Sequence, residues 1–497
     1  MFSYMKREPG FYKEVAVLAA PIVMQNLITS TLSMADTFMV GLLGEAPMAA
    51  VTLANIPIRA VNMFIFGAQS GSSILISQYW GKQDRQSISR VMGAGMWIVA
   101  VVTALFALIM NLFPLEFLSL FGNEPSVIAT AAQYGDLAAL SCFFNSFTMM
   151  YIAAYRSMEK PQLGMYILMA SMSLNTFLNW VFIFGNLGVA PMGVRGAALA
   201  TLVARIFEVC IVVIHIAVTK FFRLDLVKLF RPGGDMLRRF FIYGCPVVLN
   251  ETMWGLGTSV MPTIMGHMAN STEILAAYTI TSNVELVVNV FGFGIAATGA
   301  VIIGREIGAG RVNQIFPTGL TLSTLGALAG AALGVPLFIF ARWVAPAVVF
   351  PLFHMSAGAS AIATMMITVQ ALQMPLRDFN CVNIVGVLRG GGDVKVASLI
   401  DVCPLWVCAI PYSAVCGLVL GLSINWVYLG YVIENVVKLC LGVWRLRSGK
   451  WIRDLTTALP SYPPILLSVY VRLRLYSVCP RQPCPAADHS AEPDPIL

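Results

Sequence analysis

Long apolar runs, each ended by charged residues or by Pro and Gly, follow one another along most of the 497-residue chain. A helix needs about 20 apolar residues to cross the hydrocarbon core of a bilayer, and most of the runs exceed this length. The runs are continuous, whereas barrel strands would alternate in segments of about ten, so we expect helices. The pattern predicts twelve spanning helices at 14–42, 48–80, 88–113, 126–155, 161–185, 193–219, 239–267, 273–304, 313–341, 356–388, 394–420 and 423–444.

Composition also indicates a lipid environment. Hydrophobic residues make up 58% of the chain and charged residues 11%, whereas soluble domains carry about 25% charged residues. The net charge of +7 comes from basic residues in short loops, so we expect no nucleic-acid partner. The sequence contains no P-loop, HExxH or GxSxG motif, so we expect neither enzyme activity nor a cofactor. These features predict an all-α polytopic membrane protein.

The basic residues fix the predicted orientation, because Lys and Arg concentrate in short cytoplasmic loops. With both termini inside, residues such as Lys82, Arg156 and Arg389 fall in inner loops or at the inner helix ends, against only Arg195 and Arg342 outside. We therefore expect a multi-pass protein of the cell (inner) membrane with two cytoplasmic termini. We expect it to be a monomer.

Changes of composition suggest five regions. The charged stretch near the middle reads as a cytoplasmic linker that contains a short amphipathic helix. After the last span the sequence turns Pro- and Arg-containing, and its apolar run 463–478 is too short and too interrupted for a thirteenth span. We expect a cytoplasmic N-terminus at 1–13, an N-lobe at 14–220, a linker at 221–238, a C-lobe at 239–447, and a largely disordered cytoplasmic tail at 448–497.

The two halves of the chain repeat one another. Asn62, Phe66-Gly67 and Gly81 recur 227 residues later as Asn289, Phe293-Gly294 and Gly308. Two six-helix halves in the same order imply a two-fold axis along the membrane normal with a cavity between the lobes. This tandem arrangement is typical of secondary transporters, which bind substrate near the midplane at the repeat interface.

Short motifs in a fixed order resemble the multidrug and toxic compound extrusion (MATE) family, in its bacterial NorM/DinF-like form. The resemblance covers residues 14–447, and the tail has no counterpart. It rests on Ala-Asp-Thr-Phe-Met-Val-Gly at 35–41, Ser-Gln-Tyr-Trp-Gly at 77–81, Tyr-Arg-Ser at 155–157, Leu-Asn-Thr-Phe-Leu-Asn at 174–179, the stretch 193–201, the stretch 244–255 and Leu-Arg-Gly at 388–390.

The resemblance implies a V-shaped pair of six-helix bundles that alternate between outward-open and inward-open forms. It also implies a cation-coupled antiporter, exporting cationic, amphipathic organic compounds and drugs in exchange for H+ or Na+. No other cofactor is implied.

Asp36 is the most informative single residue, because it lies inside the first apolar run with no basic residue within helical reach. A lone carboxylate at this depth costs several kcal/mol unless it binds a cation or holds a proton. Asn175 and Asn179 share a face of the fifth helix, and Thr201 lies one turn from the Ala197 carbonyl. Such oxygen ligands suit a hard cation such as Na+. The family resemblance implies a cation site at Asp36, Asn175, Asn179 and Thr201, although the amides could simply join helices.

The C-lobe carries its own candidates for a cation or substrate site, Glu251 and Asp378, at spacings that resemble acidic positions of the family. Arg377 lies beside Asp378, so a structural ion pair is an alternative reading. Acids in both lobes leave open which lobe couples transport, and whether the ion is Na+ or H+. The spacings Arg205/Glu208 and Glu434/Lys438 predict intrahelical ion pairs.

Two other readings remain. A lipid-linked oligosaccharide flippase of the same superfamily would need more spans and a basic central cavity. A membrane protein without a transported substrate would leave the repeat and the buried acids unexplained.

Overall fold

The computed structural model describes residues 3–122, 124–353 and 355–457. Twelve long helices, some of them continued by wider turns, account for the twelve predicted spans. In the N-lobe these are α1 (Pro9–Gly41), α2 (Glu45–Gly81), α3 (Arg85–Leu112), α5 (Pro125–Ser157), α6 (Gln162–Phe184) and α7 (Gly193–Val218). In the C-lobe they are α10 (Cys245–Gly266), α11 (Ser271–Gly308), α12 (Val312–Ile339), α14 (Ala357–Cys381), α15 (Val394–Cys403) and α17 (Ile424–Arg447).

Shorter elements complete these helices. Wider, π-helical turns at Phe340–Val349, Val382–Leu388, Pro404–Ala409 and Val415–Val419 extend α12, α14 and α15, together with α13 (Phe350–Leu352) and α16 (Ile410–Ala414). The others are short helices in the connections: Ser3–Met5, α4 (Pro114–Leu118), Asn186–Gly188, α8 (Leu226–Phe230) and α9 (Gly234–Tyr243).

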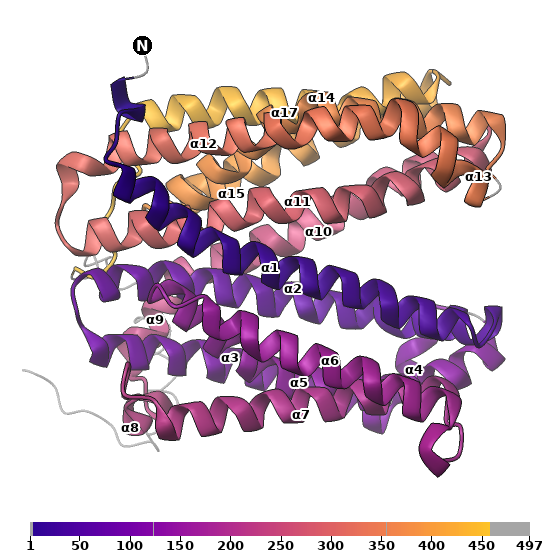
Figure 1. Cartoon of the computed structure of the whole chain (residues 1–497), viewed down its shortest axis with the longest axis horizontal. Coiled ribbons are helices and arrows are strands. Elements are labelled where there is room, and N and C mark those ends of the chain that lie inside the picture. The colour runs from indigo at the N-terminus through magenta and orange to yellow at the C-terminus, as the bar shows by residue number, and fades with distance from the viewer. Residues whose placement is uncertain (1–2, 123, 354, 458–497) are drawn as a thin grey trace, which may run out of the picture. The chain divides into compact units, whose positions relative to one another are not determined.

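The helices form two bundles, confirming the predicted architecture. In Figure 1, α1–α7 run from indigo to magenta in one bundle and α10–α17 from pink to yellow in the other, with α1 and α2 packed against α10 and α11. Among the described residues, eleven helices are long and apolar enough to cross a membrane. The twelfth, α10, falls outside that set and carries the buried polar pair Asn250 and Glu251.

The predicted start of the seventh span, at residue 239, was wrong. The expected span 239–267 is broken at Gly244, and Pro246 lies in the first turn of α10 rather than in the middle of a longer helix. A proline lacks the N–H that a first turn leaves unpaired anyway, so this position suits it. The residues before the break form α9, a short amphipathic helix that buries Met236 and Phe240 while Asp235 stays exposed.

The sequence repeat is visible as a symmetric contact between the lobes. A Cβ on Gly81 would collide with the Arg305 carbonyl, and a Cβ on Gly308 would collide with the Gln78 carbonyl. Gly81 and Gly308 are 227 positions apart, and so are Gln78 and Arg305. The ends of α2 and α11 therefore cross on the repeat axis, and small residues let their backbones approach closely, as at other membrane-helix crossings.

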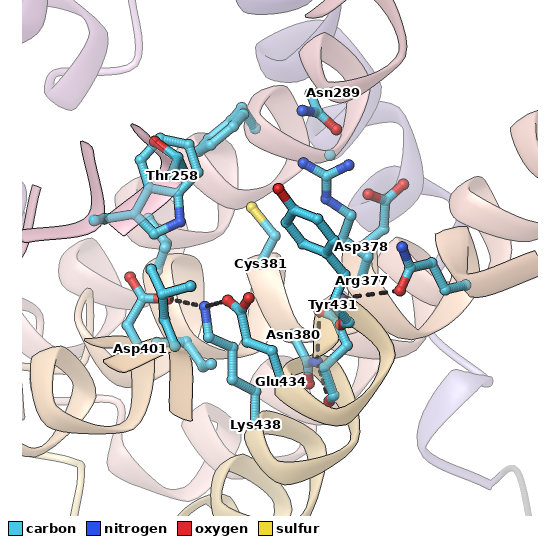
Figure 2. Close-up of a pocket in the computed structure, with 18 of the residues that line it drawn as sticks. Thr258, Asn289, Arg377, Asp378, Asn380, Cys381, Asp401, Tyr431, Glu434 and Lys438 are labelled. Atoms are coloured by element: carbon cyan, nitrogen blue, oxygen red, sulfur yellow. Dashed lines mark hydrogen bonds and ion pairs between the residues drawn. The ribbon is translucent and has the colours of Figure 1, made fainter. Parts of the chain in front are cut away.

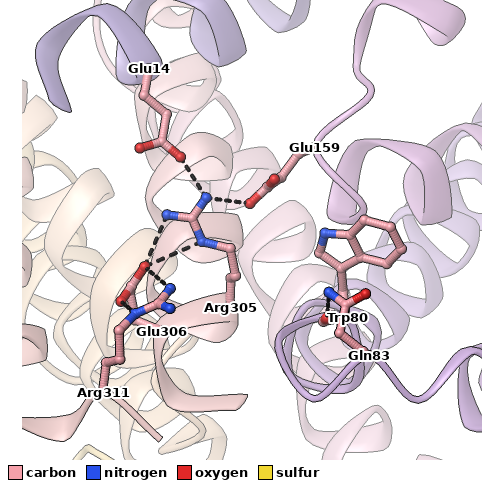
Figure 3. A network of polar contacts seen from close by, with 7 residues as sticks. All are labelled: Glu14, Trp80, Gln83, Glu159, Arg305, Glu306 and Arg311. Carbon is pink, nitrogen blue, oxygen red and sulfur yellow. Dashed lines mark hydrogen bonds and ion pairs between the residues drawn. The ribbon is translucent and has the colours of Figure 1, made fainter. Parts of the chain in front are cut away.

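Ion pairs join the lobes at this same end (Figure 3). Arg305 on α11 contacts Glu14 of α1 at 2.5 Å and Glu159, in the turn between α5 and α6, at 2.6 Å. Arg305 also pairs with Glu306 at 2.9 Å, and Glu306 holds Arg311 at 2.5 Å. One guanidinium thus ties two separate N-lobe segments to the C-lobe.

The described structure continues past residue 448, where the cytoplasmic tail was expected to begin. Trp451 is fully buried, against Gly391 and Gly319, and the Arg453 amide donates to the Gly391 carbonyl at 2.8 Å. We call residues 448–456 the C-terminal strap. The rest of the tail, for which disorder was expected, and the run 463–478 lie outside the described residues.

The strap also reaches the N-lobe. The Leu455 amide donates to Gln78 Oε1 at 2.8 Å, Lys82 pairs with Asp454 at 2.8 Å, and Arg239 donates to the Leu455 carbonyl at 2.7 Å. The strap therefore bridges both lobes beside the crossing of α2 and α11.

Candidate functional site

The five N-lobe candidates lie together on three helices. Asn179 of α6 donates to Asp36 Oδ1 of α1 at 2.6 Å. Thr201 of α7 donates to the Ala197 carbonyl at 3.0 Å, and Asn175 donates to Thr201 Oγ1 at 3.4 Å. The structure thus brings together residues that are up to 165 positions apart.

The side-chain amides of Asn175 and Asn179 lie beside the Asp36 carboxylate. Turning the Asn175 amide by 180° would let it donate to Asp36 Oδ1 at 3.1 Å and accept from the Thr201 amide at 3.3 Å. Asn179 Oδ1 is buried and has no hydrogen-bond partner among the described residues. An unpaired buried oxygen beside a carboxylate fits the ligand set of a hard cation.

Asp36 faces open space on both sides. We name the two cavities outer and inner after the predicted orientation. The outer N-lobe cavity, lined also by Asn55 and Tyr134, has a volume of about 400 Å³. The inner N-lobe cavity, lined also by Gln69 and Arg156, has a volume of about 440 Å³. The Asp36 carboxylate therefore borders two cavities, each large enough to hold a cation.

Sequence reasoning missed one neighbour of Asp36. Arg205 of α7 lines both N-lobe cavities, although no basic residue lies near Asp36 along its own helix. Its guanidinium pairs with Glu208 at 2.6 Å, which confirms the predicted intrahelical pair and balances its charge. Asp36 keeps neutral amides as its hydrogen-bond partners.

The C-lobe pocket, shown in Figure 2, is smaller, with a volume of about 130 Å³. Five carboxylates line it against two basic side chains, and Phe66, Trp254, Tyr428 and Tyr431 add aromatic surface. The acids are Glu251, Glu285, Asp378, Asp401 and Glu434, and the bases are Arg377 and Lys438.

Most of these charges are already paired. Lys438 lies between Asp401, at 2.9 Å, and Glu434, at 2.8 Å, as Figure 2 shows. Glu251 pairs with Arg389 at 2.6 Å. The predicted pair Glu434/Lys438 is confirmed, and it belongs to a larger ionic network that sequence spacing did not indicate.

Asp378 is the exception among the C-lobe acids. Its neighbour Arg377 pairs instead with Glu285, at 2.6 Å, because adjacent helical residues point apart. Asp378 Oδ2 is buried without a hydrogen-bond partner among the described residues, and a Cβ on Gly292 would lie 2.6 Å from Oδ1. The glycine of α11 thus leaves room for this carboxylate.

Comparison with known proteins identifies the family that has this architecture. The family model MatE matches residues 21–181 and 246–415, one segment in each lobe. The chain belongs to the MatE family. It is therefore a member of a family of multidrug transporters, and the predicted resemblance is confirmed.

Relatives of this MatE chain match over nearly its whole transporter region. It is 23% identical to the uncharacterized transporter YisQ of Bacillus subtilis, over 88% of this chain and 94% of that protein. It is also 23% identical to the probable multidrug resistance protein NorM of Thermotoga maritima, over 90% of this chain and 95% of that protein.

Solved structures share the fold. An outward-facing multidrug resistance MATE family transporter matches with a TM-score of 0.79 at 19% identity, covering 90% of this chain and 98% of that one. The eukaryotic MATE transporter AtDTX14 matches with a TM-score of 0.78 at 16% identity, covering 89% and 97%.

Two basic residues predicted at inner loops or helix ends of this MatE chain do lie at helix ends, but their side chains are not in open water. Arg389 is 1% exposed and holds Glu251. Arg156 lies within α5 and lines the inner N-lobe cavity. The position of a basic residue at the end of an apolar run does not reveal whether its side chain points to water or into the bundle.

Proposed function

We propose that this MatE transporter exports cationic, amphipathic organic compounds in exchange for H+ or Na+ bound at Asp36. The observation that carries the proposal is an ionisable carboxylate held by neutral amides between two cavities. The hydrogen bond from Asn179 orients Asp36 without neutralising it, so an exogenous cation or proton supplies the missing positive charge. Five acids line the C-lobe pocket and outnumber its bases even when Arg389, which pairs with Glu251, is counted with Arg377 and Lys438, and this negative balance suits an organic cation.

Alternating access requires that the lobes separate where they are now joined. In this arrangement the Arg305 network, the α2–α11 crossing and the C-terminal strap all hold the predicted cytoplasmic end closed. A cation can drive the change only through different affinities for the two states. Asp36 is placed to provide such a difference, because α1 contacts both α6 and α11.

The acidic C-lobe pocket argues against the flippase alternative, for which a basic central cavity was expected. Family membership argues against a protein without a transported substrate.

The test is transport by the purified full chain in proteoliposomes, with ethidium as substrate and a Na+ or a H+ gradient imposed separately. We expect one gradient to drive ethidium movement and Asp36→Asn to abolish it. The matched control is Asp136→Asn, an α5 acid whose Oδ1 accepts from the Leu137 amide and which lines neither N-lobe cavity. Normal transport by Asp36→Asn would remove Asp36 from the coupling mechanism.

A further inference from the structure

Arg156, near the end of α5, has a charge that no described residue balances. Its side chain is partly buried and lines the inner N-lobe cavity, and it has no hydrogen bond or ion pair to the part of the chain that the structure describes. The carbonyl end of a helix favours a cation, which explains why the charge is tolerated there. It does not satisfy the five N–H donors of a guanidinium.

The wall of the cavity is built so that Arg156 faces into it. Asn145, Met149, Ile152 and Arg156 all line the cavity, at the four-three-four spacing of one helix face. Asn145 also lines the outer cavity beside Asp36. At a rise of about 1.5 Å per residue, Arg156 lies about 16 Å further along α5 than Asn145.

The cavity therefore has two poles of opposite charge. Asp36 is the only acid among the described residues that line it, and Arg205 is balanced by Glu208. The wall between the poles carries neutral polar groups such as Gln69 and the half-buried Asn145, whose buried Oδ1 has no hydrogen-bond partner among the described residues. Nothing described in the cavity competes for the Arg156 guanidinium.

We propose that Arg156 forms a carboxylate-binding subsite in the inner N-lobe cavity, which holds the acidic end of a zwitterionic organic substrate. A guanidinium binds a carboxylate through two parallel hydrogen bonds, and these are stronger away from bulk water. A zwitterion oriented with its cationic end toward Asp36 matches both poles, whereas a purely cationic compound meets repulsion at Arg156. This inference rests on the proposed transport function.

The experiment uses two fluorescent dyes that differ only in one carboxyl group: rhodamine B, with a free carboxylate, and its ethyl ester, rhodamine 3B. Binding to the full-length protein is measured by fluorescence anisotropy in phosphatidylcholine nanodiscs, which contain no anionic lipid. We expect Arg156→Gln to weaken rhodamine B binding by about tenfold or more, as for the loss of a charged hydrogen-bonded pair, while binding of the cationic ester is unchanged or slightly tighter because the repulsion is gone. Arg59→Gln, which removes an arginine from the outer cavity only, is the matched control and should leave the acid-to-ester preference intact.

Equal loss of both dyes in Arg156→Gln, or no loss of either, would overturn the proposal. If Arg156→Gln does not fold, Arg156→Lys keeps the charge and loses the two-pronged geometry, and a wild-type-like preference for the acid in that variant also contradicts the proposal. Transport is scored separately. If a gradient drives the ester dye but Arg156→Gln leaves acid binding unchanged, the antiporter stands and only the carboxylate site fails. If no gradient moves either dye, the proposed function fails whatever the binding data show.

Discussion

The two lobes come from one repeat, yet they hold their carboxylates in opposite ways. In the N-lobe, Asp36 contacts amides and lies between cavities of about 400 and 440 Å³. In the C-lobe, the acids around a pocket of about 130 Å³ are mostly paired with Arg and Lys. A carboxylate already paired with a base gains little from another cation, whereas one held by neutral donors still needs one. The contrast favours Asp36, and in the C-lobe only Asp378, as a site for an exogenous cation.

The largest effect should come from breaking the C-lobe network. Glu251→Gln leaves the buried Arg389 with Asp401, at 3.6 Å, as its remaining acidic partner, and removing one partner of a buried ion pair costs about 3–5 kcal/mol. We expect a clear loss of thermal stability in detergent, measured by the unfolding midpoint. Asp378→Asn should leave stability near that of the wild type and instead weaken ethidium binding.

The double variant Glu251→Gln/Arg389→Gln is the control, and it should recover most of the stability because both charges are gone. A Glu251→Gln protein as stable as the wild type would mean that Glu251 is not held by its ion pair. Glu251 would then be as available to a cation as Asp36, and the contrast between the lobes would disappear.

The lobes should behave alike at the one place where they meet symmetrically. Gly81→Ala and Gly308→Ala each push a methyl group into the backbone of the partner helix, and overpacking of this kind costs about 1–3 kcal/mol. We expect similar decreases in the unfolding midpoint for the two variants. Gly10→Ala is the control, since a Cβ there meets nothing within 4 Å. A large difference between Gly81 and Gly308 would show that the interface is not symmetric in energy.

The C-terminal strap contacts both lobes, so its ion pair with Lys82 tests the joint between them at smaller scale. Although burial opposes its charge, the hydrogen bonds from Lys82 and Thr456 hold the pKa of Asp454 below its usual range. Such a carboxylate stabilises the fold above its unfolded pKa of about 3.9, and this contribution is lost as the pH falls through the lower folded-state value. Lys82→Met should therefore lower the unfolding midpoint slightly at pH 7 and at pH 5, with a shrinking difference from wild type below about pH 4.

Lys13→Met, which removes an exposed lysine from α1, is the control for the loss of one positive charge. If the effect of Lys82→Met grew as the pH fell, Lys82 would not act through Asp454.

The sequence predicted the twelve helices and the repeat through apolar length and recurring short motifs, whereas the set around Asp36 was predicted through the resemblance to the MATE family. Apolar length identifies a span, and spacing places Asn175 and Asn179 on one face. Glu251 and Arg389 are 138 positions apart, so the helical spacing of residues along the sequence could not predict that they pair. The strap was missed for a related reason: the burial of Trp451 depends on the glycines at 319 and 391, and not on its neighbours in the chain.

The central claim, that the coupling cation binds at Asp36 and opposes substrate binding, is tested most directly by titrating ethidium at several pH values and Na+ concentrations. Linkage requires that an ion which drives export also changes the affinity for the substrate, and by the same factor in both directions. We expect one of the two ions to weaken ethidium binding in the wild type, and Asp36→Asn to erase this dependence while keeping some ethidium affinity. Ethidium affinity independent of both ions, in wild-type protein that transports actively, would contradict the account and move coupling to Glu251 and Asp378.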